Sequence, residues 1–301
     1  MSWSHLKIIL KDDECLNIII HITNTYIEVG YWPLHFKRFT MVIIPKPNKK
    51  SYDSSKSFRP IILLNTVGKP IEKVIRERLQ FIIASNNFIY PSQLSSLKFK
   101  STTDVDIILT YIIWTGCIKN MSTSILTFDI TQFFPSLNHW LLTFIIRKAG
   151  FDNHIILFFA NYLVDRKTNY FWNNFISPIF NVNIRVGQSS VLSLILSALY
   201  FLLFIYILEN CLKILKILVS IISFVDNGLS ISQSNSFDIS NSRLYCRYNI
   251  LTNLLEKFSL VVKHSKTENF HFNRSHGIFN LPPLNFSSLG ENILRPNLIE
   301  S

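Results

Sequence analysis

The stretch SFVDNGLS at residues 223–230 decides the fold of this chain. A mostly apolar run at 221–225 leads into an acid, an amide and a glycine, and a second apolar alternation leaves through Leu229 and Ile231. Because Asn and Gly tolerate the positive φ of a tight turn, residues 226–228 predict the turn of a β-hairpin. From these residues alone, the hairpin is either an ordinary surface feature or one that holds Asp226 as a metal ligand.

A second acidic residue stands in a similar setting upstream. In the stretch ILTFDITQFFPS at residues 125–136, an apolar strand delivers Asp129 near its end, and two aromatic residues and a helix start follow. Two carboxylates at neighbouring strand ends can hold a pair of Mg²⁺ ions for in-line phosphoryl transfer. The second carboxylate therefore favours a metal site over an ordinary hairpin.

These two stretches resemble the reverse transcriptases of non-LTR retrotransposons, especially fungal ones. FDI to FFPS at residues 128–136 is similar to the first catalytic motif of that family. FVDNG at residues 224–228 is similar to the family's Tyr/Phe-x-Asp-Asp hairpin, with Asn227 in place of the second aspartate. The resemblance extends over roughly residues 30 to 295, and its motifs occur in the family's order.

Five further stretches support the resemblance. IPKPNK at 44–49 and FRPIIL at 58–63 resemble the first two family motifs, and QLSSLKFKSTTD at 93–104 resembles the next. GQSS at 187–190 resembles the pattern Gly-x-x-Gln-Gly-Ser, with Ser189 in place of the second glycine, and KTE at 266–268 matches a later motif. Ser189 adds a Cβ where small residues let backbone approach the template and the incoming nucleotide.

The resemblance implies an α+β fold, the fingers and palm of a right-hand polymerase, with the thumb missing or incomplete. Residues 1–25 are predicted to be a lead-in with little signal, and residues 26–275 the fingers–palm domain. Residues 276–301 are predicted to be a loop-like tail that stops before the primer grip and thumb.

The resemblance also implies a site and its ligands. It implies two Mg²⁺ ions, with Mn²⁺ as an alternative, held by Asp129, Asp226 and the backbone carbonyl of Ile130. Lys266 is then expected near the leaving pyrophosphate. Phe134 is expected as an aromatic gate against the 2′-hydroxyl, and Gln188 in the nucleotide pocket.

A basic β-hairpin is predicted from the strands at 41–44 and 57–64. Its residues Lys46, Lys56 and Arg59 are candidate triphosphate donors, and arginine suits phosphate because its planar fork donates two hydrogen bonds. A solvated lysine loop is the other interpretation. A helix over 66–83 is predicted next, with Lys69, Lys73 and Arg76 mostly off its apolar face, where they could contact nucleic-acid backbone or only solvent.

Several further elements follow from periodicity and capping residues. Ser136 is predicted to cap a helix that ends at Ala149, with Gly150 after it. Other helices are predicted over 104–117 and 240–258, and strands over 168–172, 182–186, 260–262 and 269–272.

The composition favours a polyanionic partner. The formal net charge is +11 with a sequence pI of about 9.5, and such a balance suits nucleic acid or an anionic membrane surface. With the resemblance, the expected partners are an RNA template, a DNA primer and dNTP, and no membrane. One uncharged run, residues 191–208, reaches the lower limit for a membrane span, and a buried core helix has the same composition.

The cysteines and the N-terminal residues indicate in which cellular compartment the protein is expected. Cys15, Cys117, Cys211 and Cys246 form no C-x-x-C pair, so a zinc site and a disulfide framework are not predicted. The first 17 residues are mixed polar and charged, unlike a signal peptide. The chain is expected to be intracellular, in the nucleus or cytoplasm, and not secreted.

Three hypotheses remain from the sequence. The first is a degenerate reverse-transcriptase copy, a nucleotidyltransferase by family whose activity is impaired by Asn227 and Ser189. The second is an active RNA-directed DNA polymerase that tolerates Asn227. The third is a basic membrane-associated protein with a span at 191–208.

Overall fold

The computed structural model describes residues 3–273 except 87, 89, 91, 95–99, 183–185, 188–189 and 218. The chain divides into two compact units, which are described separately. One consists of residues 1–86 and 134–199, and the other of residues 87–133 and 200–301. We call them the fingers unit and the palm unit, after the two parts that the family resemblance predicts.

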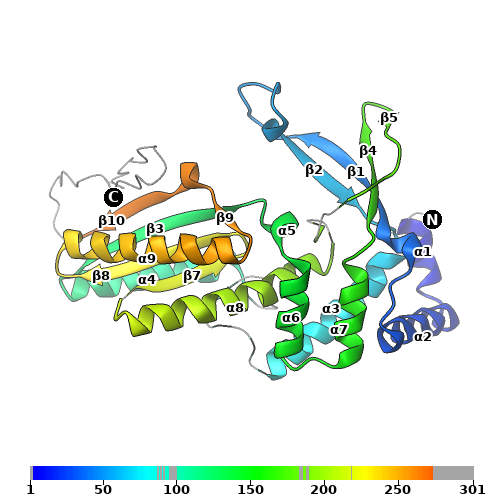
Figure 1. The fold of residues 1–301 in the computed structure, drawn as a ribbon, viewed down its shortest axis with the longest axis horizontal. Coiled ribbons are helices and arrows are strands. Elements are labelled where there is room, and N and C mark those ends of the chain that lie inside the picture. Colours follow the sequence, from blue (N-terminus) through cyan, green and yellow to red (C-terminus); the bar gives the residue numbers. More distant parts are fainter. Residues whose placement is uncertain are drawn as a thin grey trace. The chain divides into compact units, whose positions relative to one another are not determined.

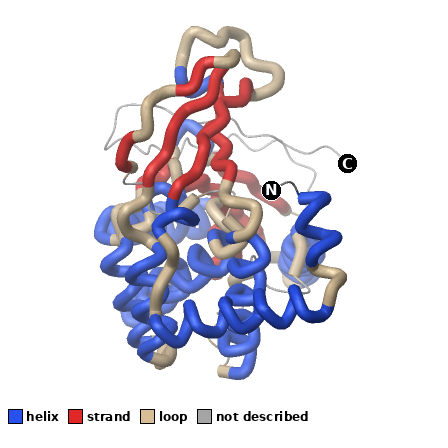
Figure 2. Tube along the Cα trace, turned by 90° about the vertical axis from the view of Figure 1, so that its right-hand side faces the viewer, coloured by secondary structure: helices blue, strands red, loops and turns tan. Residues whose placement is uncertain are grey.

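The fingers unit contains a mixed sheet with the strand order β2-β1-β4-β5 and β6 beside β4. β1 (Arg38–Pro45) pairs antiparallel with β2 (Phe58–Leu63) and parallel with β4 (Lys167–Trp172). The strands of this sheet extend beyond the helices of the same unit (Figure 2). The basic hairpin predicted from the sequence is confirmed by the β1–β2 pairing.

β4 also pairs antiparallel with two short strands, β5 (Phe175–Ile176) and β6 (Phe180–Asn181). The strand predicted at 182–186 falls largely on residues that the structure does not describe. Within 182–186, residues 183–185 lie outside the described residues, and Val182 and Val186 belong to no strand. Asn173 and Asn174 both have positive φ, 42° and 65°, so the chain reverses there, earlier than the apolar alternation indicated.

The helices of the fingers unit begin at the N-terminus, where little secondary structure was predicted. Their bounds are α1 (Trp3–Ile9), α2 (Asp13–Val29), α3 (Gly68–Ser85), α6 (His139–Lys148) and α7 (Asn153–Tyr162). The side chain of Asp12 caps α2, and Gly30, with φ 66°, ends it. α2 thus runs through residue 25, where the lead-in was predicted to end.

The start of α6 also differs from the prediction. Ser136 belongs to the short helix α5 (Phe133–Ser136), and Asn138 is the N-cap, whose side chain accepts hydrogen bonds from the backbone N–H groups of Trp140 and Leu141. Asn and Ser are comparable N-caps, so residue type alone could not separate them. Gly150 has φ 76° just past the helix end, as predicted.

The palm unit contains an antiparallel sheet with the order β10-β3-β8-β7 and β9 beside β3. α9 crosses in front of this sheet and α4 lies behind it (Figure 1). Isoleucines 125, 222 and 231 form a buried cluster with the inner face of α4. The bounds are α4 (Thr102–Ile118), β3 (Ser122–Thr131), β7 (Ser220–Phe224), β8 (Asn227–Ser234), α9 (Phe237–Lys257), β9 (Val261–Val262) and β10 (Glu268–Phe272).

α8 (Ser193–Ile214) contains most of the uncharged run. By length and composition it is the one helix of the described residues that could cross a membrane, and 56% of its apolar window is buried within the protein. A core helix passes the same test, so α8 alone supports the membrane hypothesis only weakly.

Candidate active site

Strand β3 presents Asp129 between two buried neighbours. Phe128 and Ile130 are each 2% exposed, whereas the side chain of Asp129 keeps 14% of its surface accessible. Because side chains alternate along a strand, the apolar neighbours anchor the opposite face of the sheet and leave the carboxylate free of it. The sequence prediction of a carboxylate delivered near the end of an apolar strand is confirmed.

The hairpin that carries Asp226 has a tighter turn than the sequence indicated. Phe224 pairs with Asn227, so the loop consists of Val225 and Asp226 alone. The positive φ, 56°, falls on Val225, while Asn227 and Gly228 belong to β8. A β-branched residue with positive φ is a strained position, and the prediction that Asn and Gly supply the turn was wrong.

Gly228 is needed for packing instead. It pairs with Phe128 across the sheet, and a Cβ at position 228 would meet Cζ of that ring at 2.1 Å. The glycine therefore lets the aromatic ring of β3 lie directly against the backbone of β8, next to the turn.

The two aspartates meet through strand pairing. Asp129 is the direct antiparallel partner of Asn227, the neighbour of Asp226. The N–H of Ile130 donates to the carbonyl oxygen of Asp226 at 2.9 Å. Burial raises the pKa of the Asp226 carboxyl above its usual value, and the nearby charge of Asp129 adds to the rise. The two carboxylates thus share one electrostatic environment.

Lys266 completes this cluster. It lies in η3 (His264–Lys266), and its Nζ is 2.5 Å from Oδ2 of Asp129. The N–H of Lys263 donates to the carbonyl of Asp129 at 2.7 Å, which fixes the segment before Lys266 against β3. The lysine that the sequence placed near a leaving group is therefore brought to the first aspartate, where its charge lowers the pKa of Asp226.

The carboxylate oxygens of this cluster suit a hard divalent cation such as Mg²⁺, but the cluster supplies only a small number of them. Among the residues that the structure describes, no group of three or more His, Cys, Asp or Glu side chains could hold a metal ion. Asp129 and Asp226 supply two carboxylates, and the third position of the hairpin is the amide of Asn227. An amide oxygen can ligate Mg²⁺ without adding charge.

The predicted nucleotide-binding residues belong to the fingers unit. Lys46 follows β1, where its backbone N–H donates to the carbonyl of Ser57, and Arg59 is exposed on β2 opposite Ile44. The backbone of Lys56 lies in η2 (Ser55–Ser57). Phe134 is 7% exposed in α5. Gln188 and Ser189 lie outside the described residues, so their roles stay predictions.

The basic residues of α3 differ in accessibility. Lys73 is exposed, Lys69 is half-buried, and Arg76 is paired with Glu77 at 2.7 Å. An exposed ion pair contributes little energy, so Arg76 can exchange Glu77 for a phosphate at small cost. Their contact with nucleic acid remains a prediction.

The family profile described as "Reverse transcriptase (RNA-dependent DNA polymerase)" matches residues 44–293, most of the chain. The chain belongs to the reverse transcriptase family. This confirms the family that the motifs predicted. Over 70 residues it is 36% identical to "RNA-directed DNA polymerase from mobile element jockey" of Drosophila melanogaster and 35% identical to that of Drosophila funebris. That stretch is 23% of this chain and 8% of each relative.

Solved structures support the fold of this reverse transcriptase domain. Apo telomerase from Candida tropicalis, truncated from its C-terminal domain, matches 80% of this chain with a TM-score of 0.57 and 15% identity. Telomerase from Candida albicans in complex with an RNA fragment matches 76% with a TM-score of 0.56 and 14% identity. The chain covers 51% and 42% of those chains. At this identity the likeness concerns the fold alone, and it confirms the predicted fingers–palm class.

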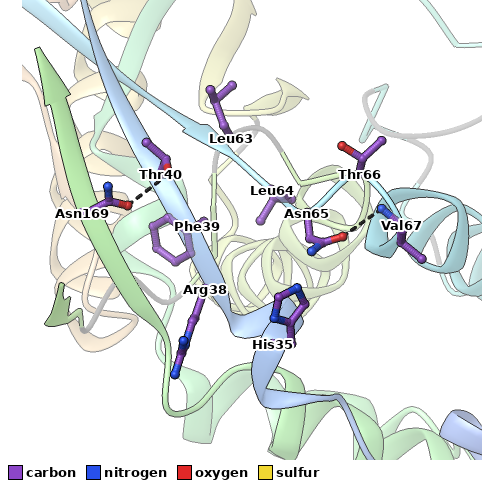
Figure 3. A pocket seen from close by; sticks show the side chains of 10 residues that line it. All are labelled: His35, Arg38, Phe39, Thr40, Leu63, Leu64, Asn65, Thr66, Val67 and Asn169. Carbon is purple, nitrogen blue, oxygen red and sulfur yellow. Dashed lines mark hydrogen bonds between the residues drawn. The ribbon is translucent and has the colours of Figure 1, made fainter. Parts of the chain in front are cut away.

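A cavity of about 520 Å³ lies at the base of the fingers sheet of this reverse transcriptase. Figure 3 shows Thr40 reaching Asn169 across β1 and β4, and Asn65 reaching the backbone of Val67 at the start of α3. Its lining includes Arg38 and no acidic residue, and all of it belongs to the fingers unit. The cavity therefore contains none of the carboxylate cluster of the palm.

Sequence reasoning missed one buried carboxylate, Glu72. Its oxygens accept hydrogen bonds from Tyr162 Oη at 2.7 Å, Ser190 Oγ at 3.0 Å and the backbone N–H of Val191 at 3.1 Å. Burial raises the pKa of the Glu72 carboxyl. Glu72 thereby holds Ser190 and Val191, which lie just before α8. Ser190 is two residues after Gln188 in the sequence. The available signal was an acid beside Ile71 on the apolar face of the predicted helix.

Proposed function

We propose that this chain is the fingers–palm part of an RNA-directed DNA polymerase of a non-LTR retrotransposon, in a copy whose catalysis is impaired. Its partners would be an RNA template, a DNA primer and dNTP. The observation that carries the proposal is the pairing of Asp129 with Asn227, the neighbour of Asp226. If the two aspartates bind metal, Asn227 would offer an amide as the third ligand. The matched relatives, polymerases of mobile elements, support the choice of substrate class.

The residues of the palm cluster fit divalent metal ions, since their donors are oxygens. Asp129, Asp226 and the carbonyl of Ile130 would hold them, and bound Mg²⁺ or Mn²⁺ would neutralise triphosphate charge and acidify the primer 3′-hydroxyl. Lys266, already within 2.5 Å of Asp129, offers a positive charge or a proton to a leaving pyrophosphate. In the fingers unit, Lys46, Lys56 and Arg59 would bind triphosphate oxygens, while Phe134 and Gln188 would select the nucleotide.

Asn227 and Ser189 are the departures that impair this chemistry. Replacing a carboxylate by an amide removes one negative charge from a site that must neutralise two dications, at a cost of several kcal/mol of transition-state stabilisation, on the order of 3. Ser189 adds a Cβ where the family has glycine. The larger loss is expected from Asn227, because charge at a metal outweighs a modest steric change.

Restoring these residues tests the proposal. The unmodified chain should incorporate little dNTP on a primed RNA template with Mg²⁺. The double substitution Asn227→Asp and Ser189→Gly should raise incorporation by about 10²-fold or more, corresponding to about 2.7 kcal/mol. Asn227→Asp alone should carry most of the gain, which a primer-extension assay measures directly.

Two controls separate the outcomes. Adding Asp226→Ala to the restored protein should abolish the gain, because only one of the two native aspartates then remains. Robust synthesis by the unmodified chain would show that Asn227 is an adequate ligand and that the copy is active. If restoration fails, Asn227 and Ser189 are not what limits synthesis, and the proposed cause of the impairment is wrong.

The location proposed for the chain is intracellular, in the nucleus or cytoplasm. All four cysteines are free thiols in the structure, which suits a reducing compartment. The nucleic-acid substrates proposed above would be available there.

A further inference from the structure

The outer face of α6 carries an exposed aromatic pair that the polymerase chemistry does not use. Trp140 is 76% exposed and Phe144, one turn later, is 38% exposed. Their rings are stacked, with centroids 5.9 Å apart and planes 9° from parallel. Large aromatic side chains normally gain most of their stabilisation from burial, so an exposed, preformed stack indicates a binding surface.

The fold of α6 does not need these rings. Leu142, Ile145 and Ile146, on the other side of the helix, are at most 4% exposed and attach it to the fingers unit. The side chain of the N-cap Asn138 starts the helix by accepting hydrogen bonds from the backbone N–H groups of Trp140 and Leu141. Truncating Trp140 should therefore leave the packing of the helix intact.

Positive charge continues the same face. Lys148 Nζ lies 5.7 Å from the centre of the Phe144 ring, and Arg147 beside it is exposed. The sequence of α6, HWLLTFIIRK, contains no acidic residue. Basic residues in a last turn also suit the helix dipole, but the dipole does not account for exposed aromatic rings leading up to them.

We propose that Trp140, Phe144, Arg147 and Lys148, here called the α6 platform, bind single-stranded nucleic acid. Bases would stack on the two rings and phosphates would lie at the two cations, the combination that sequence-tolerant single-strand binders use. The exposed residues of α6 are two aromatic and two basic ones, with no aliphatic residue among them, which favours nucleic acid over an apolar protein partner. The platform contains no residue of the proposed polymerase site, so it stands independently of catalysis.

The decisive measurement separates bases from backbone. The full chain is titrated against a fluorescent single-stranded oligonucleotide and against an abasic oligonucleotide of the same length, and anisotropy gives both affinities. Trp140→Ala should weaken binding of the base-bearing strand about tenfold and leave the abasic strand unchanged, because only bases stack. Trp140→Phe should retain most of the affinity.

The cations and a matched aromatic complete the test. Arg147→Gln with Lys148→Gln should weaken both strands and reduce the salt slope of binding by about 1.4. Trp114→Ala is the control, since Trp114 is 60% exposed on α4 but is followed one turn later by Ile118, whereas Trp140 is followed by the stacked ring of Phe144. It should change neither affinity.

Three results would overturn the proposal. One is an unchanged affinity of Trp140→Ala for the base-bearing strand. Another is an equal loss on both strands, which would assign the ring a role without stacking. The third is a loss confined to vesicles of anionic lipid or to self-association in sedimentation, which would give the surface to a membrane or to a second copy. Circular dichroism and thermal unfolding confirm that each variant is folded.

Discussion

The palm hairpin and the fingers hairpin of this reverse transcriptase are both antiparallel pairs, but they restrict their residues very differently. β7 and β8 are joined by two residues, and Gly228 leaves no room for a side chain beside Phe128. β1 and β2 are joined by the polar loop at 46–57, and Arg59 beside it is exposed. A single added carbon atom at Gly228 would disturb the palm hairpin. Binding by the fingers hairpin depends instead on the combined charge of its basic residues.

The largest expected effect therefore belongs to Gly228. Gly228→Ala would place a Cβ 2.1 Å from the Phe128 ring, so either the ring or β8 must move. We expect a loss of about 3 kcal/mol in the free energy of unfolding, at the upper end for overpacking. Urea denaturation followed by circular dichroism measures it.

Gly150→Ala is the matched control. Gly150 has φ 76°, but a Cβ there meets nothing within 4 Å. Its cost should come from backbone strain alone, about 1 kcal/mol. If the two variants lose equal stability, the contact of Gly228 with Phe128 is not what fixes the palm hairpin.

Two titratable groups, His271 in the palm unit and Glu72 in the fingers unit, should give stability opposite dependences on pH. Burial lowers the pKa of His271, on β10, to about 4, where Ser124 and Asn269 hydrogen-bond to the neutral ring. The stability that neutral His271 contributes is fully present above about pH 6.5 and is lost as the pH falls toward 4. Burial raises the pKa of the Glu72 carboxyl. The stability that protonated Glu72 contributes is therefore fully present below about pH 4.5 and is lost as the pH rises through the raised pKa.

Neutral variants isolate these two contributions. His271→Asn should remove about 1 kcal/mol of the stability lost on acidification, after allowing for the partial exposure of the ring. Glu72→Gln should reduce the loss of stability as the pH rises, because the amide does not ionise, and its oxygen can still accept the hydrogen bond from the N–H of Val191. Unfolding free energies measured from pH 4 to 8 give both slopes, and identical slopes in variant and parent would contradict the assignment.

The sequence predicted the palm site better than its turn. Asp129 and Asp226 follow apolar strands, so their convergence could be predicted from patterning and family resemblance. The strain at Val225 could not, because the pairing of Phe224 with Asn227, and not turn propensity, places the positive φ. Glu72 was missed for a related reason. The side chains that donate hydrogen bonds to it, Tyr162 and Ser190, are 90 and 118 residues away in the sequence, so no local pattern identifies them.

The N-terminal helices were missed on different grounds. α2 exposes Leu16, Ile18, Ile20 and Ile22 at 37–52%, so its apolar residues do not follow one buried face. Helical periodicity depends on such a face. The caps Asp12 and Gly30 were present in the sequence, but without periodicity between them they did not define a helix.

The smallest effect of any one residue is expected in the fingers unit, and it should appear in salt dependence. If four to six phosphates are contacted, the logarithm of nucleic-acid affinity should fall with the logarithm of salt concentration at a slope of about −3 to −5. Neutralising Arg59, Lys69 or Lys73 to glutamine should reduce the slope by about 0.7–0.9 each. Unfolding free energies should stay within about 0.5 kcal/mol, as for exposed positions generally. Fluorescence anisotropy between 50 and roughly 300 mM salt covers the range over which such slopes are resolved.

The control for charge alone is Lys257→Gln, an exposed lysine in the last turn of α9 in the palm unit. It removes the same formal charge from a chain of net charge +11, so it should leave the slope unchanged if the fingers residues make specific phosphate contacts. An equal reduction by Lys257→Gln would mean that diffuse charge binds nucleic acid and that the basic residues of β2 and α3 have no special role. Affinity independent of salt, or binding to anionic vesicles alone, would instead favour the membrane hypothesis, because counterion release accompanies every phosphate contact.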